Sequence, residues 1–203
     1  MMKRGFTLIE LLVSTAVFTI VMVVALGALL SLSEANRKAD ILNSSINNLS
    51  FALDSMSRAL RTGTNYHCTS GGILAEPKDC GAGGSSGITP GTYLTFLDAD
   101  GIRVTYRFDN AQDETSLCGQ TAKPYGCIER SVNGGAFLPL TMPEVIVTNL
   151  SFYVTGAEPK NAASEDTTQP KVTILLNAYT SVKATQKSVF SLQTSVTQRI
   201  YDL

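Results

Sequence analysis

The sequence predicts an α+β protein in which one long N-terminal helix, membrane-spanning in its first half, packs against an antiparallel β-sheet head. Three observations predict this class. Residues 6–33 form an apolar block with a single charge, at Glu10. Apolar residues at helical spacing then continue to Leu60, and the rest of the chain holds segments rich in Tyr, Thr, Ile, Val and Phe, which favour β-strands.

The charge balance argues against a protein whose main partner is nucleic acid. The 203 residues carry 16 Lys and Arg against 17 Asp and Glu, for a net charge of −1. Proteins that neutralise phosphates normally show a basic excess or a basic face. Residues 34–203 alone hold 14 basic and 16 acidic side chains, so we expect this part to be a polar, faintly acidic domain.

Residues 11–33 are long and apolar enough to cross a membrane. They carry no charge, and about 20 apolar residues in a helix span a hydrocarbon core of roughly 30 Å. Lys3 and Arg4 precede the block and Glu34 follows it, so the positive-inside rule predicts a cytoplasmic N-terminus and an exported remainder. A secretory signal peptide is the rival interpretation, but the block is too long and no Ala-x-Ala-like site ends it.

Glu10 is the unusual residue of this block. An ionisable side chain at the start of a membrane span costs about 2.5 to 3.5 kcal/mol on insertion scales and is a functional hypothesis by default. We therefore expect a positive group to pair with its carboxylate.

The run Lys3-Arg4-Gly5-Phe6-Thr7-Leu8-Ile9-Glu10 resembles the type III signal of type IV pilins and type II secretion pseudopilins. The resemblance implies a leader of residues 1–5 that a prepilin peptidase cuts behind Gly5, followed by methylation of the new N-terminus at Phe6. It also implies that residues 6–33 form a transmembrane and filament-core helix in which Glu10 sets the register of assembly. An ordinary single-span anchor, with Glu10 at the headgroup level, is the alternative.

Elementary electrostatics agrees with this resemblance. Cleavage behind Gly5 places an ammonium on Phe6 within membrane depth, close to the carboxylate of Glu10. Both charges are expensive alone and far less so as a pair. If the ammonium of one subunit meets Glu10 of a neighbour, the pair fixes the axial register of helices that could otherwise slide.

Residues 34–62 are expected to continue the helix as an amphipathic segment. No Pro interrupts residues 6–60, so one helix of about 55 residues, roughly 80 Å long, is predicted. Arg58 and Arg61 suit its C-terminal dipole, Gly63 is a natural stop, and Gly27 is a weak point that could melt in a filament. The apolar stripe, which we expect to pack on the head rather than to form a free coiled coil, consists of Ala35, Ala39, Leu42, Ile46, Leu49, Leu53, Met56 and Leu60.

Residues 63–203 are expected to form the exported β-rich head. Residues 92–97 and 102–108 flank Asp98-Ala99-Asp100-Gly101 and predict a β-hairpin. The further strand candidates are residues 127–132, 144–155, 171–179 and 188–198, which together give one antiparallel sheet of about four to six strands covered by the helix. Residues 138–141, 145–153 and 191–199 are similar to the larger minor members of the family, the J-type pseudopilin and the W-type minor pilin.

Four cysteines fall in the exported part, at Cys68, Cys80, Cys118 and Cys127. An even count in an oxidising compartment suggests disulfides, and three pairings are possible. We favour Cys68 with Cys80 and Cys118 with Cys127, because each bond would staple one loop. Free thiols and a zinc site remain alternatives, although there is no Cys-x-x-Cys spacing and His67 is the only histidine.

A calcium site is a weak candidate near the predicted hairpin. Asp98 and Asp100, with Asp109, Asp113 and Glu114 further along, could offer oxygen ligands. The same aspartates suit the turn that a hairpin requires, so turn chemistry is the preferred interpretation and no cofactor is expected. Residues 81–87 and 156–170 are polar and rich in Gly, Ser, Asn and Glu, and they predict exposed loops.

No catalytic motif is recognisable. A nucleophilic arrangement would have to use His67, which lies beside a cysteine, and there is no phosphate-binding loop or Gly-x-Ser-x-Gly elbow. We therefore expect an assembly subunit, not an enzyme, whose partners are other pilins or pseudopilins, a prepilin peptidase, an inner-membrane assembly platform and, before extraction, lipid. The expected locations are the inner membrane and then a surface pilus or a periplasmic pseudopilus. The alternative function is a membrane-tethered module that uses the loops of the head for adhesion or DNA uptake.

Overall fold

The computed structural model describes residues 5–69, 77–81, 91–110, 117–118, 125–158, 168–183 and 186–199. The chain divides into two compact units, Met1–Asn43 and Ser44–Leu203, and each is described by itself. Residues 1–4 of the predicted leader, Asp113, Glu114 and most of the two predicted loops lie outside the described residues.

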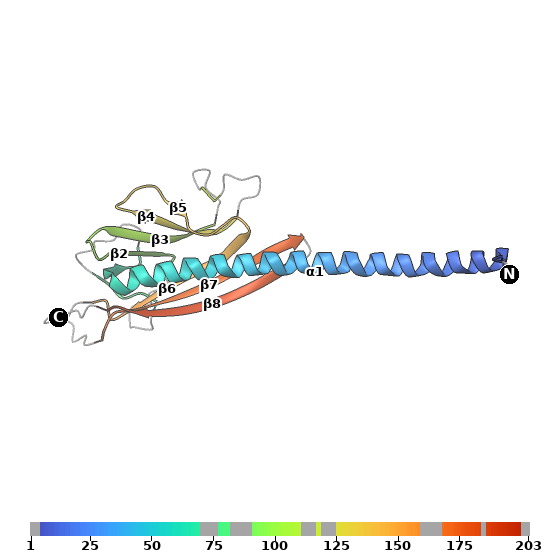
Figure 1. The fold of residues 1–203 in the computed structure, drawn as a ribbon. Coiled ribbons are helices and arrows are strands. Elements are labelled where there is room, and N and C mark those ends of the chain that lie inside the picture. The colour runs from blue at the N-terminus through green and yellow to red at the C-terminus, as the bar shows by residue number, and fades with distance from the viewer. Residues whose placement is uncertain are drawn as a thin grey trace. The chain divides into compact units, whose positions relative to one another are not determined.

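Helix α1 runs from Leu8 to Thr62 as the single long helix that the sequence predicts (Figure 1). In the second unit its buried face consists of Ser45, Leu49, Ala52, Met56 and Leu60. The predicted stripe was therefore wrong in part. Leu53 is only half-buried and Ile46 is 46% exposed. The face that packs on the head is rotated so that the small side chains of Ser45 and Ala52 lie in it, which lets the strands approach the helix closely.

The C-terminal end of α1 is fixed by one buried tyrosine. The hydroxyl of Tyr66 lies 2.6 Å from the carbonyl oxygen of Leu60 and 2.7 Å from that of Gly63. It donates its single proton to one of them at a time, at the helix end where carbonyl groups lack helical partners. Gly63 follows the helix as predicted, but for a different reason: a Cβ at this position would collide with the ring of Phe96. The sequence predicts that the helix ends near Gly63. The structure shows in addition that the end of the helix lies too close to the sheet for a larger residue at this position.

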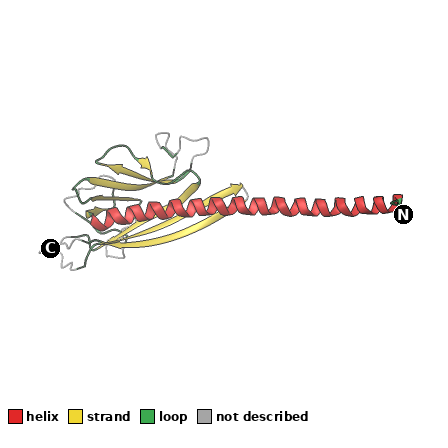
Figure 2. Ribbon diagram, in the orientation of Figure 1, coloured by secondary structure: helices red, strands yellow, loops and turns green. Residues whose placement is uncertain are grey.

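In the second unit, the described strands form two antiparallel sheets rather than the one that the sequence predicts (Figure 2). The first has the order β1-β2-β3-β4-β5 and the second the order β6-β7-β8. The strands of the first sheet are β1 (Thr64–His67), β2 (Tyr93–Leu97), β3 (Arg103–Asp109), β4 (Cys127–Val132) and β5 (Leu138–Pro139). Those of the second are β6 (Val145–Thr155), β7 (Lys171–Lys183) and β8 (Gln186–Thr197).

The chain changes sheets between β5 and β6. Pro143 lies in this connection and cannot donate a ladder hydrogen bond. The preceding Met142 N–H donates instead to the side-chain oxygen of Asn48 on α1, at 3.1 Å. Pro143 and the contact with α1 therefore mark the boundary between the two sheets. The alternating pattern of the sequence does not reveal this boundary.

Both sheets contribute to one apolar core with the helix. Alternate residues of β6 and β7 are buried, including Leu150, Phe152, Ile174 and Leu176. From the first sheet, Phe96 packs with its ring centroid 5.9 Å from that of Tyr106. Strands with a period of two thus present one face to the core, as the alternation in the sequence predicts.

The predicted hairpin is confirmed in detail. β2 and β3 pair in an unbroken register from Tyr93 opposite Arg107 to Leu97 opposite Arg103. In the turn, one carboxylate oxygen of Asp98 accepts the N–H groups of Asp100 and Ile102 at 3.0 and 2.9 Å. Gly101 has φ of +75°, a conformation that glycine adopts without strain.

Candidate processing and assembly site

The first turn of α1 carries a capping arrangement. The N–H of Leu11 donates to the carbonyl oxygen of Thr7 at 3.2 Å, and the N–H of Glu10 lies 3.4 Å from the Thr7 hydroxyl oxygen. Thr7 is therefore the N-cap and Glu10 the third helical residue, the spacing of a capping box. Sequence reasoning missed this role of Thr7, although Thr-x-x-Glu before an apolar run is its signal.

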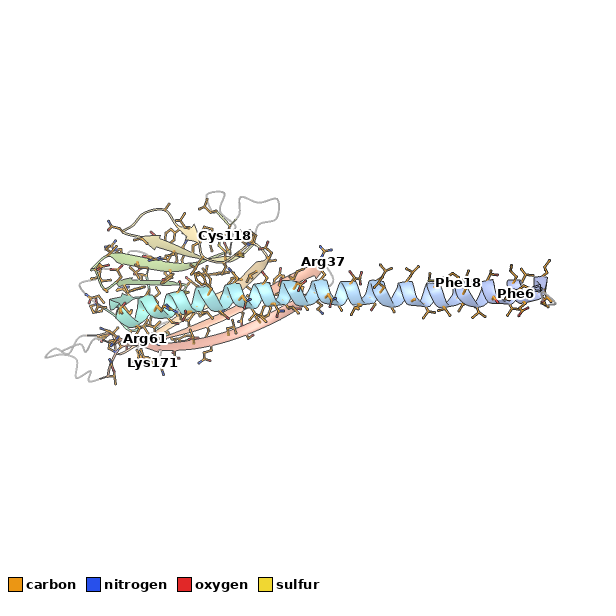
Figure 3. The ribbon with its side chains drawn as sticks, in the orientation of Figure 1. Phe6, Phe18, Arg37, Arg61, Cys118 and Lys171 are labelled. Carbon is orange, nitrogen blue, oxygen red and sulfur yellow. A yellow bond between two sulfur atoms is a disulfide. The ribbon has the colours of Figure 1, made fainter. Side chains whose placement is uncertain are left out.

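The sequence-predicted processing residues lie together at this end. Gly5 and Phe6 immediately precede the helix, and Phe6 is 81% exposed (Figure 3). Glu10 is the acidic residue of the first turn. Unsatisfied N–H groups give a helix N-terminus a partial positive charge, so a carboxylate is favourable there. A second positive charge added at Phe6 would increase the demand for such a carboxylate.

The helix that follows is apolar on every side. α1 contains a stretch long and apolar enough to cross a membrane, and none of that stretch is buried within the protein. A helix that is hydrophobic all round belongs in an apolar environment such as lipid or a bundle of other helices. Its exposed large side chains include Leu12, Val13, Val17, Phe18, Ile20, Val21, Val24, Leu26, Leu29 and Leu30.

Three hydroxyl groups of this apolar stretch, those of Ser14, Thr15 and Thr19, are satisfied within the helix itself. Ser14 donates to the carbonyl oxygen of Glu10 at 2.7 Å, and Thr19 donates to that of Ala16 at 2.8 Å. The hydroxyl of Thr15 lies 3.0 Å from the carbonyl oxygens of both Leu11 and Leu12. Because these groups need no water, they can be buried in hydrocarbon at low cost.

The four cysteines form two disulfides, in the pairing that the sequence favours. Cys68 is bonded to Cys80 and Cys118 to Cys127, with Cα atoms 6.1 and 6.2 Å apart. Cys118 is labelled in Figure 3. Each bond closes a segment of the head, so the first ties the end of β1 to the residues that pair with β6.

Asp98 and the four cysteines have other roles in the structure, and Asp100 takes part in the turn through its backbone N–H. Asp98 uses its carboxylate for the turn between β2 and β3. Among the described residues, Cys118, Cys127 and Glu129 place possible ligand atoms within 4.8 Å of one another. The two sulfurs are joined in a disulfide, so neither offers the thiolate that zinc prefers. The ring nitrogen Nδ1 of His67 lies 2.9 Å from the Thr69 hydroxyl.

A buried charge cluster lies on the outer side of the first sheet, and sequence reasoning missed it. Arg107 of β3 donates to Glu129 of β4 at 2.7 Å and lies 3.5 Å from a carboxylate oxygen of Asp109. The Glu129 side chain is 1% exposed. The guanidinium also stands over the ring of Phe137, 3.9 Å from its centroid. One cation therefore serves two buried acids.

The electrostatics of this cluster are set by burial. Burial raises the pKa of Glu129, while the hydrogen bond and charge of Arg107 oppose that rise. Burial by itself lowers the pKa of Arg107, but the hydrogen bonds and charges of Glu129 and Tyr93 together outweigh this effect, and the pKa is raised. No signal in a single sequence could have found the pair, because it depends on the register that sets Arg107 opposite Glu129.

Comparison with protein families gives one result. The model of the prokaryotic N-terminal methylation motif matches residues 1–26. The match covers the first turn of α1 and most of the apolar stretch at residues 11–33. No curated protein and no solved structure matches the chain at the threshold for significance.

Proposed function

We propose that this chain, whose methylation motif is the signature of type IV pilins and pseudopilins, is a minor pilin or pseudopilin that helps to initiate or cap a filament. The filament is a type IV pilus or a type II secretion pseudopilus. The observation that carries the proposal is the motif at residues 1–26, at the start of a helix whose apolar side chains are exposed on every side. The role is structural and requires no catalysis by the chain.

The proposed mechanism begins with cleavage behind Gly5. This step creates an ammonium at Phe6, one residue before the capping residue Thr7. The ammonium adds to the positive end of the helix dipole, and both are best neutralised by carboxylate. Glu10 of a neighbouring subunit supplies it, so each new subunit stops at the axial position where the two charges meet.

Extraction from the membrane follows from the apolar surface of α1. Side chains such as Phe18 and Leu29, which are 60% and 62% exposed, contact lipid before assembly and other helices after it. The two environments are similarly apolar, so the exchange is close to neutral and small energy inputs can drive it. The satisfied hydroxyls of Ser14 and Thr19 suit both environments equally.

The size of the head supports a position at the filament tip. The described residues of the head form two sheets and two disulfides. A subunit that primes or caps the filament occurs in few copies and can carry a larger domain. This step is an analogy with the larger minor members that the sequence resembles.

The test separates processing from assembly. In a host with an active prepilin peptidase, mass spectrometry of the mature chain is expected to find an N-methylated Phe6. Glu10→Gln removes the charge and keeps the side-chain shape, so we expect cleavage and membrane insertion to persist while recovery of the chain in sheared filaments falls about tenfold, the worth of one lost charge pair. Ser14→Ala, one turn further along, is the matched control and should leave recovery unchanged.

Two results would contradict the proposal. An uncleaved N-terminus in that host removes its premise. Normal filaments with Glu10→Gln in place would instead favour a membrane-tethered binding module, whose loops need no register.

A further inference from the structure

The two sheets formed by the described residues of the head have four edge strands. Three of these have features that prevent the pairing of a further strand. β5 contains only two residues, one of them Pro139. β1 has four residues and an irregular register between Thr64 and His67. The free side of β6 is bridged by Cys80 and Gly91. Short strands, proline, irregular pairing and covering segments are the means by which proteins prevent further pairing at an edge.

Within the described part of the chain, the fourth edge, β8, has none of these devices. It extends over 12 residues from Gln186 to Thr197 and contains no Pro or Gly. Its only charged residue is Lys187. The Lys187 amine lies 4.5 Å from the ring centroid of Tyr179 on β7. The side chain therefore lies over the sheet, where its charge does not hinder pairing at the edge of β8.

The hydrogen bonds identify which backbone groups of β8 face outward. The N–H and C=O of Phe152 both bond to Gly91, so they point away from β7. Phe152 is paired with Ile174, whose groups must then point toward β8, where Ile174 is paired with Thr194. Backbone direction alternates along a strand. The residues whose N–H and C=O point away from β7 are therefore Val189, Ser191, Gln193, Ser195 and Thr197.

No other described residue donates to or accepts from these outward backbone groups. The side chains at the same positions lie on the solvent face, where Ser191, Gln193 and Ser195 are exposed. The open edge therefore presents a row of backbone donors and acceptors flanked by uncharged side chains, which are polar except for Val189, 74% exposed near one end. Such a row is a template for one more strand.

The core side of β8 is incompletely covered. Phe190 and Leu192 are half-buried. Their partners on β7, Ala178 and Leu176, are each 1% exposed. A strand added beside β8 would cover Phe190 and Leu192 as β8 covers β7. It would need apolar side chains at alternate positions on that side and uncharged polar ones on the other.

We propose that β8 binds one extended segment of a different protein, which pairs along Val189–Thr197 as a fourth strand of the second sheet. The segment is uncharged and alternates apolar with polar residues. It comes from a loop, a chain end or the open edge of another sheet, because a strand that is paired on both sides has no free backbone groups to offer. This proposal goes beyond filament assembly and does not depend on processing at Gly5.

A second copy of this chain fits the edge less well. α1 runs along the strands of the second sheet within the head (Figure 1). Antiparallel pairing of two β8 strands would reverse one copy's residues 44–62 relative to the other's, whereas copies anchored in one membrane enter it in the same direction. Parallel pairing of two β8 edges would place their apolar faces on opposite sides of the sheet.

The experiment maps contacts along the edge in the full chain. A benzoylphenylalanine photo-crosslinker is placed singly at positions 191, 193 and 195, in cells that produce the chain with its native assembly proteins. Crosslinked peptides are then identified by mass spectrometry. We expect all three positions to reach one segment of one protein, with the contact moving by about two residues for each step along β8. Scattered contacts, no contacts, or contacts to β8 of a second copy would overturn the proposal.

A pair of variants tests the backbone directly. Gln193→Pro removes an N–H that β7 does not use, whereas Gln193→Ala removes only the side chain. We expect the proline variant to lower crosslinking from position 195 about tenfold, the effect of losing a backbone hydrogen bond and local pairing, and the alanine variant to leave it unchanged. Equal yields in the two variants contradict strand addition. Thermal melting of each variant shows whether it folds. The crosslinking series at positions 191, 193 and 195 uses a chain without the proline, so it remains a valid test if the proline variant does not fold.

Discussion

Glu129 is the residue on which the electrostatics of the head depend most. Its carboxylate is buried, and its partner Arg107 also faces Asp109. Removing one member of a buried pair leaves an uncompensated charge, which costs more than the pair itself contributes. The pair is therefore a sensitive point for substitution, whatever its net contribution to stability.

Arg107→Met is expected to destabilise the head by about 3 kcal/mol at neutral pH, the usual cost of breaking a buried pair. Burial raises the pKa of Glu129 above its ordinary value of 4.5. The stability linked to this proton is thus complete below pH 4.5 and is lost as pH rises through the folded-state pKa. Removing Arg107 takes away the opposing hydrogen bond, so the destabilisation should be smaller at pH 4, where Glu129 is protonated. Thermal melting at both pH values measures this difference.

Arg58→Met is the matched control for that measurement. Arg58 pairs with Asp54 at 2.9 Å, but the two side chains are 80% and 61% exposed. Exposed pairs contribute about 0 to 1 kcal/mol. A loss with Arg107→Met that is equally small, or that grows at low pH, would show that Glu129 is not held ionised by this arginine.

At the same scale, the sequence made Gly5, Phe6 and Glu10 recognisable because their roles depend on spacing along one short segment. Arg107 and Glu129 are 22 positions apart and meet only through strand register. A single sequence contains no information on that register until the strands are aligned. The capping role of Thr7 could have been predicted from its spacing to Glu10, but the sequence analysis overlooked it.

Among the elements, β4 and β6 meet where the two sheets approach most closely. Gly126 immediately precedes β4, and its carbonyl oxygen accepts the N–H of Val147 of β6 at 2.8 Å. A Cβ on Gly126 would collide with the carbonyl oxygen of Val147, which is backbone and cannot turn aside. The join between the sheets therefore requires glycine at this position.

Gly126→Ala is expected to lower the stability of the head by about 2 kcal/mol, because overpacking against backbone forces the two sheets apart. Chemical denaturation followed by circular dichroism measures the loss. Gly27→Ala serves as the comparison, since a Cβ there meets nothing within 4 Å. If both variants have the wild-type midpoint, the contact between the sheets is not tight.

The helix and strands also show which elements can be predicted from the sequence. The long helix and the six longer strands follow from residue periodicity and turn residues, and all six are present within a few residues of the expected ends. β1 and β5 are too short to carry a pattern. The division into two sheets depends on Pro143 and on the bond from Met142 to Asn48, which links residues 94 positions apart.

For the whole molecule, the two disulfides and the charge around the apolar stretch indicate the same orientation. Lys3 and Arg4 precede the stretch, and a cytoplasmic N-terminus follows from the positive-inside rule. All four cysteines lie after the stretch and are disulfide-bonded, a state typical of an oxidising compartment. Both features are expected of a head that is exported, as the proposed function requires.

An alkaline phosphatase fused to the C-terminus of the chain is expected to be active, because that enzyme folds only on the oxidising side of the inner membrane. The same fusion without residues 1–33 should remain in the cytoplasm and be inactive. Phosphatase activity in whole cells is the measurement. An inactive full-length fusion that is nevertheless present in the membrane would place the head in the cytoplasm.

The N-cap at Thr7 also determines what a peptidase could change at the start of α1. Thr7 and Glu10 both lie on the C-terminal side of Gly5, so loss of the leader would leave the helix beginning at the same residue. In the proposed function, proteolysis exchanges a basic leader for one ammonium while the conformation of the subunit stays constant. Precursor and mature subunit would then have the same fold and differ only in the charge at the N-terminus. The growing filament would distinguish the two by that charge alone.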